Sequence, residues 1–256
     1  MTFPDGAVTL IAMIATDSHT EMEVMIVADE WPQMHALSTA LASRSGLVIH
    51  ATEEEGIPAD LSPYDAVIMY VHGVMGPQLE QALIRYALQG GRLVILHHGL
   101  ASGKIRNPAW MEFTGMHIEP PDAAANAWKV LAPVTHTLVN LNPKHYITSH
   151  DVTYNAEISY QSSDALTQPG LYPALPLLDT ELFLNQQFTD GREKTVLFGA
   201  HCIHPDTGKT VMQDRGGWVK PAGNGWICYL QPGHSEQDFM IPSFNQIILN
   251  SITWAP

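Results

Sequence analysis

Cysteine and basic residues are scarce in this sequence. Its 256 residues include two cysteines, Cys202 and Cys228, which cannot supply a disulfide framework and whose spacing matches neither a CxxC redox pair nor a zinc ribbon. Twelve Lys and Arg stand against 26 Asp and Glu, which gives a formal net charge of −14. A surface of this sign repels phosphate backbones and anionic lipids, so neither nucleic acid nor membrane is an expected partner.

Long hydrophobic runs are also missing. The apolar stretch at residues 7–15 is too short to span a bilayer, and no basic residue precedes it as in a signal peptide. We therefore expect a cytoplasmic protein. The length, with 45% hydrophobic and 15% charged residues, is typical of one globular domain. No repeat or linker divides the chain, so we expect a single domain over residues 1–256.

Short apolar runs alternate with helical patterns in the first hundred residues. The runs at 8–15, 47–50, 65–71 and 93–96 predict strands that are buried on both faces. Helices are predicted over 30–43 and from Pro77 to the Gly90-Gly91 pair. This alternation is typical of βαβ units, so we predict a three-layer, flavodoxin-like α/β fold with a mainly parallel sheet and helices on both faces.

The pattern loosens between about residues 99 and 187, where prolines interrupt every periodic stretch. We expect long loops there and a small antiparallel insert, with a loop-rich part at about 117–163. Regular patterns return as predicted strands at 195–200 and 226–230 and as a closing helix. One face of that helix carries Phe244, Ile247, Ile248 and Ile252.

Histidine is the residue in excess: 13 histidines outnumber Lys and Arg together. Several follow predicted strands, namely His19, His72, His97, His98 and His234. Because parallel strands present their carboxyl ends at one edge of a sheet, we expect these side chains to converge. A single such histidine has about even odds of being structural, but convergence favours function. Imidazoles near a carboxylate can hold a divalent metal, move a proton or bind sugar hydroxyls, and spacing does not choose among these.

Two common site types are absent. The turn after the predicted strand at 93–96 reads Leu96-His97-His98-Gly99-Leu100, with no serine or cysteine at its apex, which disfavours acyl-enzyme chemistry. The Gly90-Gly91 pair is not followed by a GxGxxG turn, so a dinucleotide fingerprint is missing too.

Four segments together resemble one known family. They are the glycine-rich approach to a strand ending in histidine at 90–97, an acidic segment at 173–183 (PALPLLDTELF), a strand followed by Gly-His at 225–234 (GWICYLQPGH), and the terminal helix ending at 250–255. In these segments the sequence resembles the trehalose-utilisation, or ThuA-like, family, which has a class I glutamine amidotransferase-like fold.

The resemblance implies carbohydrate metabolism, with a disaccharide or a keto-sugar derivative as the small-molecule substrate. In the acidic segment either Asp179 or Glu181 could face the site, and we choose Glu181 because it stands directly before Leu182-Phe183. The implied catalytic residues are His97, Glu181 and His234, which are also the candidate ligands for a divalent metal such as zinc. The implied substrate-binding residues are His19, His72 and His98.

Two kinds of function stay open on the sequence alone. The first is an enzyme acting on sugars, and the second is a non-catalytic sugar-binding or assembly subunit that kept the fold without the nucleophile. An amidotransferase would need a cysteine where His97 and His98 stand. Four tryptophans could stack on sugar rings, but core packing is favoured for each: Trp31, Trp110, Trp128 and Trp218. A homo-oligomer is expected, with Met75, Met116 and Trp254 as candidates for its interface.

Overall fold

The computed structural model describes residues 21–256 except 122, 124–125, 163, 165–166 and 190–193. The predicted strand at 8–15 and His19 therefore lie outside the described residues. The first described strand is one that the sequence analysis missed. It is β1, Met22–Ala28, an apolar segment just before the first helix, and it pairs with both β2 and β3.

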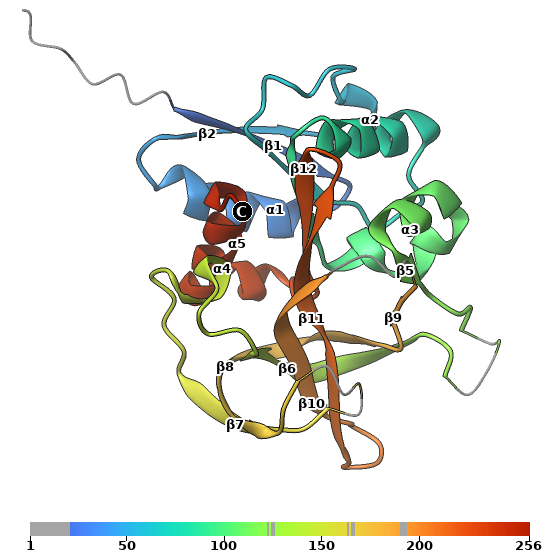
Figure 1. Cartoon of the computed structure of the whole chain (residues 1–256), viewed down its shortest axis with the longest axis vertical. Helices are drawn as coiled ribbons and strands as arrows, with labels where there is room; N and C mark the ends of the chain where they lie inside the picture. Colours follow the sequence, from blue (N-terminus) through green and yellow to red (C-terminus); the bar gives the residue numbers. More distant parts are fainter. Residues whose placement is uncertain (1–20, 122, 124–125, 163, 165–166, 190–193) are drawn as a thin grey trace, which may run out of the picture.

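One sheet of ten strands runs through the molecule in the order β2-β1-β3-β4-β12-β11-β10-β6-β8-β7 (Figure 1). Its first half is parallel and has the 2-1-3-4-5 order of flavodoxin-like folds. The α/β fold class is thus confirmed. Besides β1, the parallel strands are β2 (Leu47–Thr52), β3 (Ala66–Tyr70), β4 (Arg92–Leu96) and β12 (Gly225–Leu230).

The other half of the sheet is antiparallel and larger than the small insert predicted. Its prolines do not end the strands: Pro173 and Pro176 lie within β8, and Pro133 lies in β6 where the pairing with β8 shifts register. The segment 117–163 contributes one long strand, β6, and one short strand, β7, and most of its other described residues lie outside helices and strands. The elements are β6 (Lys129–Asn140), β7 (Ala156–Tyr160), β8 (Gly170–Leu184), β10 (Thr195–Ile203) and β11 (Thr210–Ala222), with a separate pair β5 (Met116–His117) and β9 (Gln187–Phe188).

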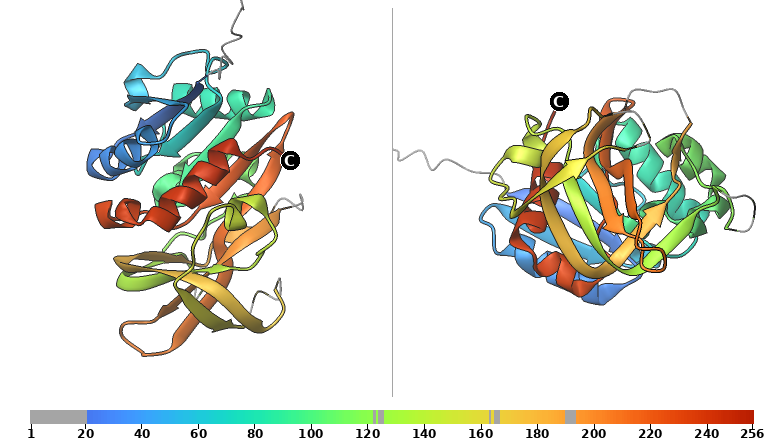
Figure 2. Two further views of the ribbon diagram at one scale, coloured as in Figure 1. Left: turned by 90° about the vertical axis from the view of Figure 1, so that its left-hand side faces the viewer. Right: turned by 90° about the horizontal axis from the view of Figure 1, so that it is seen from below.

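Helices cover both faces of the parallel half, as predicted (Figure 2). Alternate residues of β3 show this: Ile68 packs in the same cluster as α1 and α5, and Met69 in the cluster of α2 and α3. The α-helices are α1 (Trp31–Ala42), α2 (Pro77–Leu88), α3 (Pro108–Thr114), α4 (Tyr146–Ser149) and α5 (Pro242–Thr253). The 3-10 helices are η1 (Glu54–Gly56), η2 (His97–Leu100), η3 (Ser102–Arg106) and η4 (Glu236–Met240).

Several apolar candidates from the sequence belong to the core. Trp110, Trp128 and Trp218 are buried and pack in the cluster under α2 and α3. Met75 and Met116 are buried in the same cluster, so the prediction that they cover an oligomer interface is wrong. Within the described part of the chain, every helix is too short or too polar to cross a membrane.

Candidate functional site

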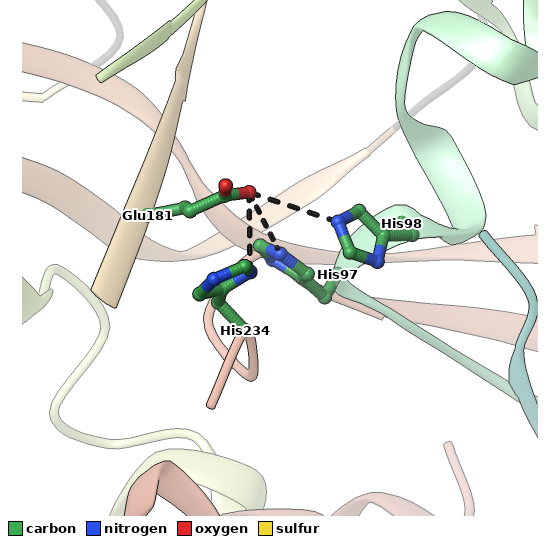
Figure 3. A group of neighbouring side chains, drawn as sticks. All are labelled: His97, His98, Glu181 and His234. Atoms are coloured by element: carbon green, nitrogen blue, oxygen red, sulfur yellow. Dashed lines mark ion pairs between the residues drawn. The ribbon is translucent and has the colours of Figure 1, made fainter. Parts of the chain in front are cut away.

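Two strand ends of the parallel half bring three histidines to one place. β4 runs directly into His97 and His98, and β12 is followed by the turn that carries His234. These three side chains meet Glu181 of β8, and one ligand atom from each of the four lies within 4.8 Å of the others (Figure 3). We call His97, His98, Glu181 and His234 the His/Glu cluster.

One carboxylate oxygen is the centre of the His/Glu cluster. Oε2 of Glu181 lies 3.3 Å from Nδ1 of His234, 3.4 Å from Nε2 of His97 and 3.6 Å from Nε2 of His98. The Glu181 side chain is 17% exposed, so the centre of the cluster is largely shielded from solvent. Three imidazole nitrogens therefore surround one partly buried oxygen.

The hydrogen bonding of His97 fixes which of its nitrogens carries the proton. Nδ1 lies 2.7 Å from the carbonyl oxygen of Gln231, and because a carbonyl only accepts, Nδ1 is the donor. Burial lowers the pKa of His97, so the ring is neutral and Nε2 holds a lone pair. Among the described residues, that nitrogen has no hydrogen-bond partner. Its lone pair faces the Glu181 carboxylate, and only a proton or a cation between them makes this contact favourable.

His98 lies between two carboxylates. Its Nε2 faces Glu181, and its Nδ1 lies 3.6 Å from Oε2 of Glu30, the residue before α1. The other oxygen of Glu30 is 2.9 Å from Nδ1 of His72, whose ring stacks on His98 at 3.9 Å between centroids. Burial lowers the pKa of His98 to about 4, so this ring is also neutral at pH 7. His72, 58% exposed, lies at the rim beside Glu30 and does not touch Glu181 in the cluster.

Glu181 is ionised over a wide pH range. Burial by itself raises the pKa of its carboxyl, but a proton or a cation shared with Nε2 of His97 and of His98, together with the neighbouring His234, outweighs burial, so the pKa lies below its ordinary value. A carboxylate that holds its proton so weakly is a poor base. It is well suited to bind a cation.

Buried side chains that the sequence did not single out hold the cluster in position. Gln231 accepts from the backbone N–H of Phe183 through Oε1, and its Nε2 donates to the carbonyl of Arg215. His136 of β6 is fully buried and donates from Nδ1 to the backbone carbonyl of Glu181. Gln231 falls within the 225–234 segment of the family resemblance, but nothing in the pattern distinguished it, and nothing pointed to His136 or Glu30.

The donor set fits a divalent metal. Zinc binds imidazole nitrogen and carboxylate oxygen at about 2.0–2.2 Å, and tetrahedral geometry then separates the ligand atoms by roughly 3.3–3.6 Å. The distances from Oε2 of Glu181 to the three histidine nitrogens, 3.3 to 3.6 Å, fall in that interval. The unprotonated Nε2 of His97 supplies the lone pair that such an ion requires.

Fold and site together define an α/β protein with a His/Glu cluster at the carboxyl edge of its parallel strands. No family model and no curated protein matches the sequence. Among solved structures, a ThuA-like protein from Parabacteroides merdae superposes with a TM-score of 0.67 at 13% identity, over 91% of this chain and 89% of that one. A ThuA-like protein from Bacteroides uniformis gives 0.61 at 15% identity, over 98% and 94%.

A β-galactosidase from Rahnella sp. R3 is also similar, with a TM-score of 0.51 at 13% identity over 90% of this chain. This chain corresponds to 31% of that enzyme. At these identities the comparisons establish the fold, and the chain has the fold of the ThuA-like proteins. The expected resemblance is confirmed at that level.

Proposed function

We propose that this protein is an enzyme of carbohydrate utilisation that acts on a disaccharide or keto-sugar derivative at the His/Glu cluster. The observation that carries the proposal is the placement of three imidazole nitrogens around Oε2 of Glu181 at the carboxyl edge of the parallel strands. This edge is where open α/β sheets place their ligands. The fold shared with two ThuA-like proteins supports the carbohydrate assignment.

His97, Glu181 and His234 are the residues that would hold a divalent ion such as zinc. Three protein ligands with one further position left for substrate is the usual arrangement of a catalytic zinc site. When bound, the ion would act as a Lewis acid on the carbonyl oxygen of a keto sugar. Gln231 and His136 would keep this set in place, because one accepts from Nδ1 of His97 and the other donates to the Glu181 backbone.

His98 is the best-placed proton acceptor in the cluster. It is neutral at pH 7, whereas Glu181 is too weak a base for the role. With the Nδ1 proton directed toward Glu30, the lone pair on Nε2 faces the interior of the cluster. In our proposal Nε2 takes a proton from the carbon next to the sugar carbonyl and returns it to the oxygen that leaves or rearranges.

The proposal is tested by elemental analysis of the purified protein and a turnover screen on native and keto disaccharides. We expect one divalent ion per chain, and at least a 100-fold loss of turnover in His97→Ala, Glu181→Ala and His234→Ala. His117→Ala is the matched control, because His117 is exposed and forms an ion pair with Glu119 outside the cluster.

Wild-type turnover in all three cluster variants would refute the enzymatic role. Tight sugar binding without turnover in the wild-type protein would favour the alternative, a non-catalytic sugar-binding or assembly subunit. The cytoplasmic location and the homo-oligomer stay predictions from the sequence.

A further inference from the structure

A pocket of about 600 Å³ is lined by residues that neighbour Glu181 and His234 in the sequence. One wall comes from Pro176, Leu178 and Asp179 of β8, just before Glu181. The facing wall begins with Ser235, directly after His234, and continues to Ile241. The two segments that supply Glu181 and His234 to the cluster therefore also form this pocket, which has the volume of a typical small-molecule site.

Asp179 is the second carboxylate of the acidic segment, and it is one of the residues that line the pocket. The sequence left open whether Asp179 or Glu181 faces the site. In the structure Glu181 contacts the histidines, while Asp179 lines the pocket. The backbone of Asp179 has φ of +51°, a left-handed conformation that Asp and Asn tolerate better than most residues. Strained residues of this kind concentrate at ligand sites.

Asp238 adds a buried polar atom to the same pocket. Its side chain is 1% exposed, and Oδ2 accepts hydrogen bonds from the Thr180 hydroxyl at 2.7 Å and the Ser235 backbone at 3.3 Å. Its Oδ1 is buried and has no hydrogen-bond partner among the described residues. Buried polar atoms are nearly always paired, so this unpaired oxygen in a wall residue of the pocket marks a position where a hydrogen-bond donor is expected.

The chemistry of the walls selects one class of ligand. Among the described residues that line the pocket there is no Lys or Arg, so nothing there would neutralise a phosphate or carboxylate. Carboxylates and the Gln237 amide suit hydroxyl groups, and Leu178, 64% exposed, offers an aliphatic surface for the C–H face of a ring.

We propose that this pocket is a subsite for an uncharged sugar ring, with Asp179 as its main hydroxyl-binding residue. The inference rests on the proposed function and deepens it: the substrate is a non-phosphorylated disaccharide, with one ring at the His/Glu cluster and the other in the pocket.

The test measures sugar binding by isothermal titration calorimetry on the zinc-loaded full chain. The probes are trehalose and maltose, their keto derivatives and 6-phosphates, and methyl α-glucoside with its keto derivative as one-ring ligands. The variant is Asp179→Asn, which removes the charge but keeps the size and the tolerance of positive φ. Asp206→Asn, at an exposed turn, is the control. We expect about tenfold weaker binding of the neutral two-ring probes by Asp179→Asn, and less than a twofold change for the one-ring probes.

A second variant, Asp179→Gly, removes the whole side chain without backbone strain and should weaken two-ring binding at least as much. The subsite proposal is overturned if both variants bind the disaccharides as tightly as the wild-type protein does. It is also overturned if the wild-type protein binds the 6-phosphates as tightly as the neutral disaccharides, or if it binds none of the two-ring probes. Metal content and turnover are measured on the same samples. If metal content and turnover are normal but Asp179→Asn does not change two-ring binding, the subsite proposal fails and the proposed enzymatic function stands. If two-ring binding depends on Asp179 but the protein shows no turnover, the proposed enzymatic function fails and the subsite stands.

Discussion

The two halves of the sheet contribute to the site in different ways. In the parallel half, His97, His98 and His234 follow strand ends, so the chain order alone brings them to one edge. In the antiparallel half, Glu181 lies within a fifteen-residue strand, and its side chain reaches the cluster because of register. Glu181 and Phe183 face the histidines, while Leu182 packs into a separate apolar cluster, so a slip of one residue would remove the carboxylate from the site.

The largest effect is expected where the two halves are joined. Gln231, fully buried after β12, bonds to the backbone of Phe183 in β8 and of Arg215 in β11 and to the side chain of Gln186. Gln231→Leu leaves these buried groups unpaired, which should lower the free energy of unfolding by about 3 kcal/mol or more. The melting temperature should fall by on the order of 6–12 °C.

The matched control for that substitution is Gln81→Leu, which changes an exposed glutamine of α2. Chemical denaturation of both variants gives the comparison. If Gln231→Leu loses no more stability than Gln81→Leu, the connection between the halves does not depend on this side chain.

The antiparallel half should also carry a pH dependence of stability, through His136. Burial lowers the pKa of this histidine to about 4, whereas the unfolded chain has the ordinary value of about 6.5. Above pH 6.5 both states are neutral and the pKa difference has no effect. Between pH 6.5 and 4, His136 binds a proton in the unfolded chain but stays neutral in the folded chain. The free energy of unfolding therefore falls as the pH falls, and the contribution of His136 to this loss is roughly 2 kcal/mol at pH 5.

Urea denaturation at pH 7 and pH 5 measures this contribution. His136→Asn should be less stable than the wild type at pH 7 but lose about 2 kcal/mol less between the two pH values. His150→Asn, at an exposed histidine, should keep the wild-type difference. Equal pH differences in all three proteins would show that His136 does not titrate in this way.

The same contrast explains what the sequence could and could not predict. Apolar runs bounded by glycine predicted β3, β4 and β12, and hence the meeting of His97, His98 and His234, because a parallel sheet places all its strand ends at one edge. The strands β6 and β8 were missed because their prolines look like breaks in a single sequence, although Pro133 lies at a register shift and Pro173 and Pro176 lie at regular pairings. Glu181 came only from the family resemblance. Glu30, Gln231 and His136 lie far along the chain from the groups they contact, and no local pattern reveals such partners.

The smallest effect we expect belongs to Glu30, which reaches His98 from within the parallel half. If Glu30 orients His98 as a proton acceptor, Glu30→Gln should lower kcat on a keto disaccharide by about tenfold, a fraction of what full loss of acid–base catalysis costs. Because the proposed ligands are His97, Glu181 and His234, the metal content should not change. Glu53→Gln, at an exposed carboxylate near α1 that bonds to Trp31, controls for the loss of charge. If Glu30→Gln instead loses bound metal, we would infer that His98 is a metal ligand and that Glu30 is the carboxylate that orients it. The metal site would then lie closer to the parallel half of the sheet.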